Sequence, residues 1–337
     1  TLSADGNKRI WTFSAWFKRG TPGSYNTLFG SFFGESSRYY LARFRNTDVL
    51  DIFSGNYTTG SSTTQQLNFV TNTVYRDPSA WYHIVIAQDT TQSTESNRFK
   101  IYINGVLLES SDFSTASYPG LNTEGFLNAA NATHYIGQYG ENQHYFDGQM
   151  ADIQLVDGQQ LLPTDFAETR SSDGVWVPKE FTGFGKNPNN GTTWSSATLS
   201  NGSNLANLFD GNLSTNAQQS TNGTAASVSN FGPITVASTV SFYSPDGDAR
   251  YTLNGGSEVS KSGTGWHDLS FSGSLTSFTF QGPGNTRIFI YGMKVDGVPL
   301  LDGAVDNSFH LNFSDSSTIE ALGFDSAPTT PDPDPKK

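Results

Sequence analysis

The chain has no cysteine, and methionine occurs only twice among its 337 residues. The absence of cysteine excludes disulfide bridges, thiolate nucleophiles and Cys-ligated zinc sites. Stability must therefore come from packing and hydrogen bonds. The absence of cysteine does not decide the cellular location, because a large β-protein without disulfides suits a particle assembled in the cytoplasm as well as a bacterial surface.

Positive charge is also scarce, with 19 Lys and Arg against 31 Asp and Glu and a formal net charge of −12. A protein of this charge repels nucleic-acid phosphates and anionic lipid. No apolar run approaches the roughly 20 residues that span a bilayer, and no signal peptide is visible. We therefore expect a soluble folded part with no nucleic-acid partner and no membrane insertion.

Aromatic residues are plentiful, at 13%, and Ser, Thr, Asn and Gly lie between them. This mixture is typical of many short strands separated by turns, and the length favours two domains. Residues 11–17 place Trp11, Phe13, Ala15 and Phe17 on one face of a strand. The Asn104-Gly105 pair between apolar runs indicates a type I′ hairpin.

A few further elements follow from local patterns. The stretch Leu161–Thr169, with a proline near its start, is the one convincing short helix. Trp11, Trp16, Trp81 and Trp266 are expected in cores, as aromatic residues of β-sandwiches usually are. The composition and patterns together predict an all-β protein.

Four segments carry a resemblance to a known family. They are Trp11–Arg19, Asp77–His83, Ile101–Gly105 and Phe146–Asp152, which reads F-D-G-Q-M-A-D. Together they resemble the laminin-G/concanavalin-A-like lectin family, most closely the version in bacteriophage tail and appendage proteins. The resemblance covers about residues 1–182 and implies a laminin-G-like β-sandwich.

The resemblance also implies an insertion. In that family a segment like Val175–Gly183 runs directly into one like Ser308–Asp315, but here the two are far apart. Insertions are tolerated at surface loops. We therefore predict a laminin-G-like sandwich at 1–185, an inserted domain at 186–303, a return segment at 304–326 and a Pro-rich extended tail at 327–337.

The predicted insert is a second, smaller jelly-roll or β-sandwich domain. Its segments Ala206–Thr215 and Ile288–Gly297 resemble discoidin-like, galactose-binding-like modules. In such modules the first loop often holds a structural Ca²⁺, so the resemblance suggests Asp210 and Thr215 as side-chain ligands. The aromatic residue that usually follows the Ser-Thr pair and the usual late glutamate are both missing, which favours an Asx-type turn.

Catalytic residues are not expected. Retaining glycoside cleavage needs two carboxylates about 5–5.5 Å apart, hence acidic residues at alternate strand positions. Asp246 and Asp248 occupy alternate positions, but they lie in a Ser-Pro-Asp-Gly-Asp turn. Asp147 and Asp152 are an odd number of residues apart, so they would point to opposite faces of a strand. The five histidines have no zinc-ligand spacing, and no Gly-x-Ser-x-Gly motif supports a Ser-His-Asp triad, although one sequence does not decide that point.

Glycan binding uses aromatic rings beside polar side chains. The sequence offers two candidate loops. They contain Tyr139, His144 and Tyr145 in the first domain and Tyr243, Asp246, Asp248 and Arg250 in the insert.

The resemblance thus implies a non-enzymatic phage virion protein, a tail, tail-fibre or capsid-appendage subunit that acts in assembly and attachment to host-surface glycan. Its partners would be other copies of itself, other virion proteins and cell-surface glycan. The alternatives are a bacterial surface adhesin or self-assembling filament subunit and, in another class, a polysaccharide-degrading glycoside hydrolase.

Overall fold

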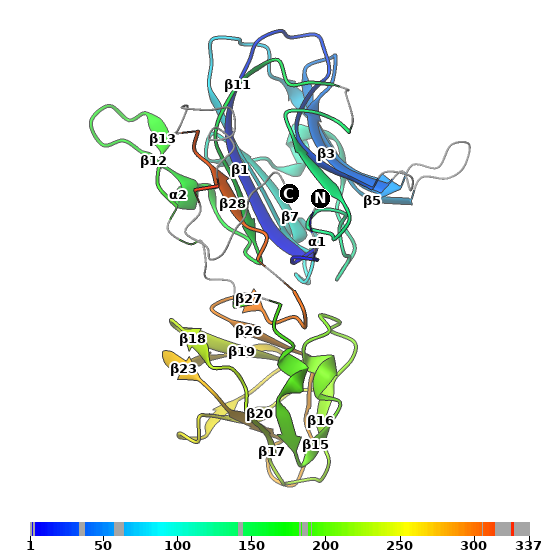
Figure 1. Ribbon diagram of the computed structural model, residues 1–337, viewed down its shortest axis with the longest axis vertical. Coiled ribbons are helices and arrows are strands. Elements are labelled where there is room, and N and C mark those ends of the chain that lie inside the picture. The colour runs from blue at the N-terminus through cyan, green and yellow to red at the C-terminus, as the bar shows by residue number, and fades with distance from the viewer. Residues whose placement is uncertain are drawn as a thin grey trace. The chain divides into compact units, whose positions relative to one another are not determined.

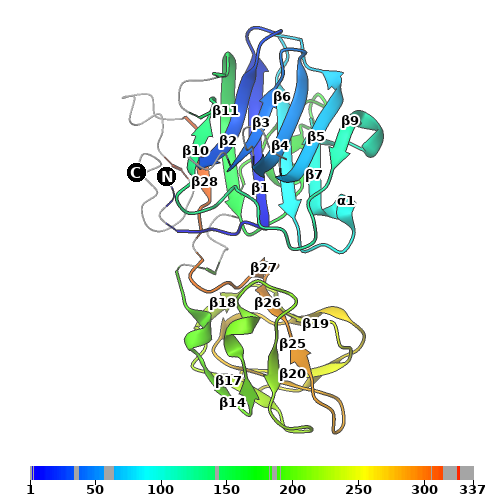
Figure 2. The same ribbon diagram turned by 90° about the vertical axis from the view of Figure 1, so that its right-hand side faces the viewer.

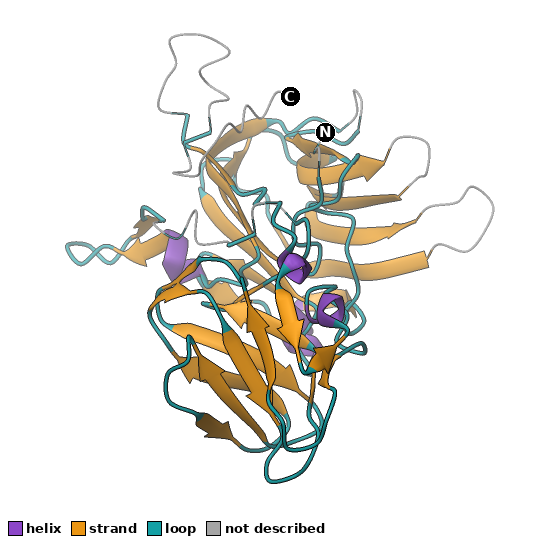
Figure 3. Ribbon diagram, turned by 60° about the horizontal axis from the view of Figure 1, so that its bottom comes forward, coloured by secondary structure: helices purple, strands orange, loops and turns teal. Residues whose placement is uncertain are grey.

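The computed structural model describes residues 2, 4–33, 38–56, 64–140, 144–181, 183, 188–189, 191–304, 306–313 and 325–326. The chain divides into two compact units, Thr1–Gly185 with Asn307–Lys337, and Lys186–Asp306. The sequence interpretation ends the insert at residue 303, and its predicted tail at 327–337 lies outside the described residues. Figure 3 shows strands throughout both units, which confirms the all-β prediction.

The first unit contains a six-stranded antiparallel sheet in the order β28-β11-β1-β6-β7-β8. Its strands are β1 (Ile10–Arg19), β6 (Tyr82–Asp89), β7 (Phe99–Ile103), β8 (Val106–Leu107), β11 (Gly148–Asp157) and β28 (Phe309–Leu311), with α1 (Glu95–Arg98) before β7. Figure 1 shows the late strand β28 beside β11, where Ile153 pairs with Leu311. The last described strand of the chain therefore completes a sheet that the first strand begins.

A second six-stranded antiparallel sheet packs against the first, and Figure 2 shows the two layers. Its order is β10-β2-β3-β4-β5-β9. The strands are β2 (Asn26–Phe33), β3 (Arg38–Phe44), β4 (Val49–Asn56), β5 (Thr64–Val74), β9 (Phe113–Ser117) and β10 (Thr133–Ile136), with the 3₁₀ turn η2 (Ser110–Asp112) before β9. Face-to-face sheets of this kind bury the alternate residues of both inner surfaces.

The core between the sheets is rich in aromatic rings. Trp11, Phe13 and Phe17 of β1 are all fully buried, as the alternation predicts. The ring of Phe13 stacks on Phe29 of the opposite sheet, with centroids 4.3 Å apart. Burying each such side chain contributes about 2–3 kcal/mol to stability. The predicted hairpin is confirmed as well, because Asn104 and Gly105 both have positive φ between β7 and β8.

A buried ion pair lies at one end of this core. The Arg19 Nη1 atom donates to the Asp48 Oδ1 atom at 2.9 Å and to the Tyr75 carbonyl at 2.6 Å. The Asp48 carboxylate also accepts hydrogen bonds from the Gly23 N–H and from Arg76. Burial acts to raise the pKa of Asp48, but these donors together hold the pKa below its usual value.

Two local predictions need correction. Of the helix predicted at Leu161–Thr169, only the single turn α2 (Pro163–Phe166) forms, and residues 167–169 become strand β12 (Ala167–Thr169). That strand pairs with β13 (Trp176–Pro178), so tertiary pairing overrides the local helical pattern. Trp81 is 41% exposed rather than in the core, because it immediately precedes β6.

The second unit consists of four small antiparallel sheets. Their orders are β14-β17-β24-β20-β21, β22-β19-β26-β27, β15-β16-β25 and β18-β23. The strands are β14 (Thr198–Ser200), β15 (Gly202–Ser203), β16 (Ala217–Gln219), β17 (Ala226–Ser229), β18 (Ile234–Val236), β19 (Thr239–Ser244), β20 (Ala249–Leu253), β21 (Val259–Lys261), β22 (Gly265–Ser270), β23 (Gly273–Leu275), β24 (Phe278–Gln281), β25 (Phe289–Ile290), β26 (Gly292–Val295) and β27 (Val298–Pro299). Two 3₁₀ turns, η3 (Trp194–Ser196) and η4 (Leu205–Leu208), precede most of them.

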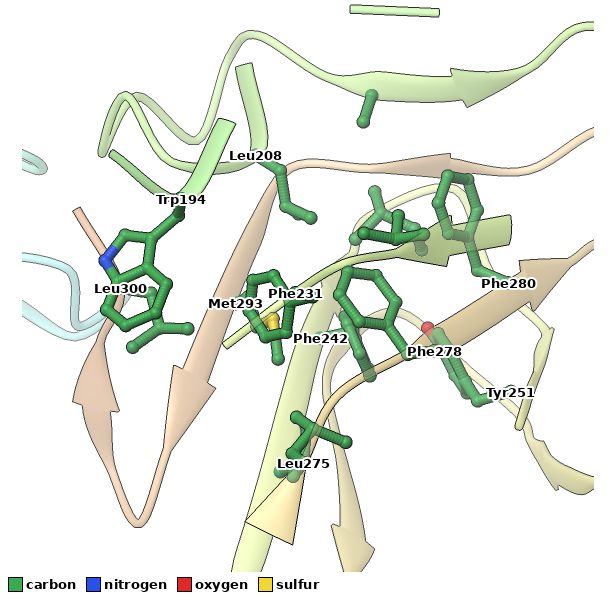
Figure 4. Packing of buried hydrophobic residues seen from close by; sticks show 14 of the residues in the cluster. Trp194, Leu208, Phe231, Phe242, Tyr251, Leu275, Phe278, Phe280, Met293 and Leu300 are labelled. Carbon is green, nitrogen blue, oxygen red and sulfur yellow. The ribbon is translucent and has the colours of Figure 1, made fainter. Parts of the chain in front are cut away.

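This unit has a hydrophobic core of its own, shown in Figure 4. The Phe231 ring meets the Phe278 ring edge to face at 5.1 Å, and Phe242 stacks on Tyr251 at 4.9 Å. The Phe242–Tyr251 contact joins β19 and β20 of different sheets, and Phe231 packs from the segment between β17 and β18. Among the described residues of the whole chain, no helix has the length and apolar character needed to cross a bilayer.

Candidate functional site

The sheet β10-β2-β3-β4-β5-β9 has one face turned away from the core, which we call the outer face. Tyr40, Ala42 and Phe44 of β3 are buried in the core. Because side chains alternate along a strand, Tyr39 and Arg43 point to the outer face. Cross-strand pairing brings further side chains to this face, namely Thr27, Phe32, Leu41, Asp51, Phe53, Asn68 and Tyr135.

Four rings gather on the outer face, and we call them the aromatic cluster: Tyr25, Tyr39, Tyr139 and His144. The imidazole of His144 stacks on Tyr25 with centroids 4.8 Å apart and on Tyr139 at 5.7 Å. The Tyr139 ring meets the Tyr39 ring at 5.8 Å and 81°. All four side chains are partly accessible to solvent. The arrangement forms a continuous row of rings at the surface.

Backbone hydrogen bonds fix the segment that carries two of these rings. The Gly137 N–H donates to the Leu28 carbonyl at 2.9 Å, and the Thr27 N–H donates to the His144 carbonyl at 3.1 Å. The Phe146 N–H donates back to the Gly137 carbonyl at 2.7 Å. Both ends of the segment between β10 and β11 are therefore held against the start of β2.

A charged group adjoins the aromatic cluster. The Asp51 carboxylate is almost fully buried, at 2% exposure, and lies 3.0 Å from the Nε atoms of both Arg43 and Arg45. The Arg43 guanidinium carbon is 4.9 Å from the centroid of the Tyr25 ring, a cation–π distance. Asp51 is the only acidic residue in the six strands of this sheet within their described bounds.

The surroundings shift the pKa values of two rings of the aromatic cluster, His144 and Tyr139. Burial lowers the pKa of His144, and the positive charge of Arg43 lowers it further. Burial raises the pKa of the Tyr139 hydroxyl, while Arg43 acts in the opposite direction. Both side chains are therefore uncharged at neutral pH.

The structure thus brings together two of the three residues predicted in this loop. Tyr145 is 54% exposed, and its carbonyl lies 3.5 Å from the Asn26 amide nitrogen. Sequence reasoning missed Tyr25, Tyr39 and Arg43, which come from strands or turns about 100 positions earlier. Alternation alone could have assigned Tyr39 and Arg43 to a non-core face, but only the strand register places them beside Tyr139.

The residues predicted in the second unit divide into two groups. Tyr243 lies 5.3 Å from Trp266 and 6.5 Å from Tyr291, between ring centroids. Asp246 hydrogen-bonds to Tyr291 and raises the pKa of that hydroxyl, although burial is the larger cause. Trp266, predicted in the core, is half-buried, with the Lys294 ammonium 4.2 Å from its ring.

Asp248 and Arg250 are held by other partners. The Asp248 Oδ1 atom accepts the Gly263 N–H at 2.8 Å. The Arg250 side chain contacts Glu258 at 3.3 Å and donates to the Gly282 carbonyl at 2.9 Å. These contacts tie the two side chains to neighbouring strands and turns of their own unit.

The predicted calcium loop is closed by its own hydrogen bonds. The two Asp210 carboxylate oxygens accept the Asn212 N–H at 2.8 Å and the Thr215 hydroxyl at 2.6 Å. No group of three or more His, Asp or Glu side chains suited to a metal occurs in the described part of the chain. Ca²⁺ takes six to eight oxygen ligands, so this donor set does not fit the ion as it stands. These contacts therefore lend no support to the calcium site expected at Asp210 and Thr215.

A buried serine–histidine pair lies on the other sheet. The His83 Nε2 atom is 2.9 Å from the Ser14 hydroxyl, and the Trp176 indole N–H donates to His83 Nδ1 at 3.1 Å. Because an indole nitrogen only donates, Nδ1 is unprotonated and Nε2 carries the hydrogen. In a catalytic triad Nε2 must instead accept the serine proton, with a carboxylate on Nδ1. The pair therefore has the wrong tautomer for that role.

Comparison with known proteins agrees with this architecture. Residues 3–161 match the family model Laminin_G_3, described as the concanavalin A-like lectin/glucanases superfamily. The search of curated proteins gave no match.

Three solved structures illustrate the similarity. The CBM40 of the Ruminococcus gnavus IT-sialidase, bound to α2,3-sialyllactose, is 14% identical with a TM-score of 0.31, and the match covers 45% of this chain and 76% of that one. Domain 4 of the GH43 arabinanase AbnA from Geobacillus stearothermophilus, in complex with arabinotriose, is 16% identical with a TM-score of 0.30, covering 48% and 65%. Domains LG4-5 of the mouse laminin α1 chain are 9% identical with a TM-score of 0.30, covering 89% and 85%.

Structural similarities of this size carry no argument by themselves. The family match and the two packed antiparallel sheets point to the same architecture. Residues 3–161 therefore have the concanavalin A-like, laminin-G-like fold.

Proposed function

We propose that the first unit binds glycan on its outer face, along the aromatic cluster. The observation that carries this proposal is the row of Tyr25, His144 and Tyr139 rings beside the Arg43 guanidinium. Sugar recognition combines aromatic surfaces, which pack against the apolar faces of pyranose rings, with a few polar groups that fix orientation. This face supplies both kinds of group.

We further propose that the unit binds without cleaving. Hydrolysis of a glycosidic bond normally needs two carboxyl groups that flank it. The one acidic residue in the described strands of this sheet, Asp51, is buried and paired with two arginines. A carboxylate in that state is a poor proton donor and a poor nucleophile, which supports a binding module over the alternative of a glycoside hydrolase.

The biological setting that we propose is attachment of a virion to its host. It rests on the resemblance of the first unit to phage tail and appendage proteins. Many copies on one particle convert weak single-site binding into firm attachment. The second unit, proposed as a discoidin-like module with its own cluster at Tyr243, would add contacts.

Electron microscopy of the protein in its native assembly tests this setting. Copies decorating a capsid or tail together with other virion proteins are expected. Partner-free helical filaments would instead favour the alternative, a bacterial surface adhesin or filament subunit.

The glycan-binding proposal is tested on an array of immobilised neutral and acidic polysaccharides, with bound glycans then titrated by calorimetry. The double variant Tyr139→Leu/His144→Asn keeps apolar volume at one position and a residue that tolerates positive φ at the other. Loss of two stacked rings should weaken binding about tenfold or more. The matched control is Trp81→Leu, a 41% exposed ring just before β6 of the other sheet, and Tyr243→Leu measures the contribution of the second unit.

Unchanged binding by the double variant, with loss in Tyr243→Leu, would move the site to the second unit and contradict the proposal. Cleavage of any bound polysaccharide, detected as new reducing ends, would contradict the non-enzymatic part.

A further inference from the structure

The outer face carries positive charge in a chain of strongly negative net charge. Arg43 and Arg45 share the single carboxylate of Asp51, which leaves one positive charge without a neutralising partner in the group. The formal net charge of the whole chain is −12. A local excess of the opposite sign draws an oppositely charged ligand to that place.

We propose that the glycan bound on the outer face is anionic, and that Arg43 and Arg45 hold its carboxylate or sulfate group. This inference rests on the proposed glycan-binding function and specifies its substrate class. The two anionic groups present the same chemistry to arginine, namely clustered acceptor oxygens with a negative charge.

Asp51 acts as the positioning residue for both guanidinium groups. Its Oδ2 atom lies 3.0 Å from Nε of Arg43 and of Arg45, and its Oδ1 atom accepts a bond from Nη2 of Arg45 at 3.0 Å. A buried carboxylate needs such partners, so these bonds orient the two side chains. The guanidinium groups are therefore placed before any ligand arrives.

Both arginines have N–H groups that do not bond to Asp51. A guanidinium has five N–H donors, and the bond between Arg43 and Asp51 uses only the Nε–H. The side chains of Arg43 and Arg45 are 22% and 37% exposed. Their remaining N–H groups suit the paired oxygens of a carboxylate or sulfate, which arginine binds in a fork.

The position of Arg43 links the anion to the sugar ring. Its guanidinium lies over Tyr25, the ring that stacks on His144. An acidic sugar packed along the aromatic cluster would thus reach Arg43 with its anionic substituent. The anion-binding Arg43 and the ring of Tyr25 are therefore in direct contact, which fits recognition of a single charged monosaccharide.

The test uses two matched pairs of probes. Polygalacturonate is compared with its carboxyl-reduced form, and dextran sulfate with dextran, so that each pair differs only in the anionic group. We expect the anionic member of at least one pair to bind about tenfold more tightly or better, since hydrogen bonds to charged groups are the stronger kind. Added salt should reduce that difference.

The key variant is Arg43→Gln/Arg45→Gln/Asp51→Asn, which removes the one excess positive charge, leaves no buried carboxylate unpaired and keeps hydrogen-bonding groups at all three positions. It should lose most of the preference for the anionic member while circular dichroism stays native. Arg287→Gln, an exposed arginine of the second unit, is the control for general loss of positive charge and should bind as the parent does.

Outcomes separate this inference from the proposed function. Equal binding to both members of each pair, still sensitive to Tyr139→Leu/His144→Asn, would overturn the anionic specificity and leave glycan binding in place. A preference that Arg43→Gln/Arg45→Gln/Asp51→Asn does not change would overturn the role of this arginine pair. Failure of every glycan to bind would overturn both proposals.

Discussion

We expect the first unit to lose stability as the pH falls from 7 to 5, because folding keeps His83 neutral. Burial lowers the pKa of this imidazole from 6.5 to about 4, although the charge of Asp152 acts in the opposite direction. A proton on Nδ1 would also face the indole N–H of Trp176, so that two donors would oppose each other. The folded state therefore resists protonation.

The sign and the size follow from linkage. Between pH 6.5 and 4 the unfolded chain binds a proton at this residue and the folded chain does not, so stability decreases as the pH falls through that window. With these two pKa values, the relation gives a loss of about 2 kcal/mol between pH 7 and pH 5.

The assay is urea unfolding followed by tryptophan fluorescence at both pH values, for the parent and for His83→Gln. Glutamine does not titrate and can still hydrogen-bond, so the variant should show about 2 kcal/mol less pH dependence whatever its stability at pH 7. The quantity to compare is the change in unfolding free energy between the two pH values, parent minus variant. His134, whose pKa burial also lowers to about 4, contributes equally to both proteins and cancels. An unchanged pH dependence, or an NMR titration of His83 near pH 6.5, would refute the reasoning.

Further predictions concern the ion pair, a turn and the loop of the second unit. Arg19→Met should cost about 3–5 kcal/mol in denaturant unfolding, because it leaves the Asp48 carboxylate buried without its main cation; a loss under about 1 kcal/mol would contradict this. Asp296→Ala should cost about 2 kcal/mol, since the carboxylate accepts hydrogen bonds from three consecutive backbone N–H groups, of which the last begins β19; faster hydrogen exchange of those amides gives the check. Replacing CaCl₂ with EDTA should leave the melting temperature of the second unit unchanged, because Asp210 and Thr215 already bond to each other; a clear rise with calcium would show that the loop opens to bind the ion.

The sequence allowed the strands and the hairpin to be predicted where the signal is local. Alternation identified the buried face of β1, and positive φ at Asn104 and Gly105 follows from the residue types. The helix predicted at 161–169 was wrong in its second half, because pairing with β13 decides the conformation of residues 167–169. The prediction that Trp81 lies in the core was wrong, because β6 begins one residue later and the Trp81 ring stays outside the sandwich.

The candidate site could be predicted only in part for the same reason. Tyr139 and His144 are near in sequence, and their aromatic and polar character marked them. Arg43 reaches them through the register of β2 with β3, a pairing that local composition does not specify. The buried Asp51 beneath the arginines was invisible in the sequence, because an acidic residue in a strand is usually taken as solvent-facing.

The place of β28 at the sheet edge bears on how the protein is made. A ribosome releases β11 well before β28, with the whole of Lys186–Asp306 synthesised between them. Until Ile153 of β11 pairs with Leu311 of β28, the nascent sheet has an unpaired edge strand. Such an edge can pair with other chains and cause aggregation. A premature stop anywhere in the second unit would make that edge permanent, so truncated products should be recognised by chaperones through a defect in the first unit.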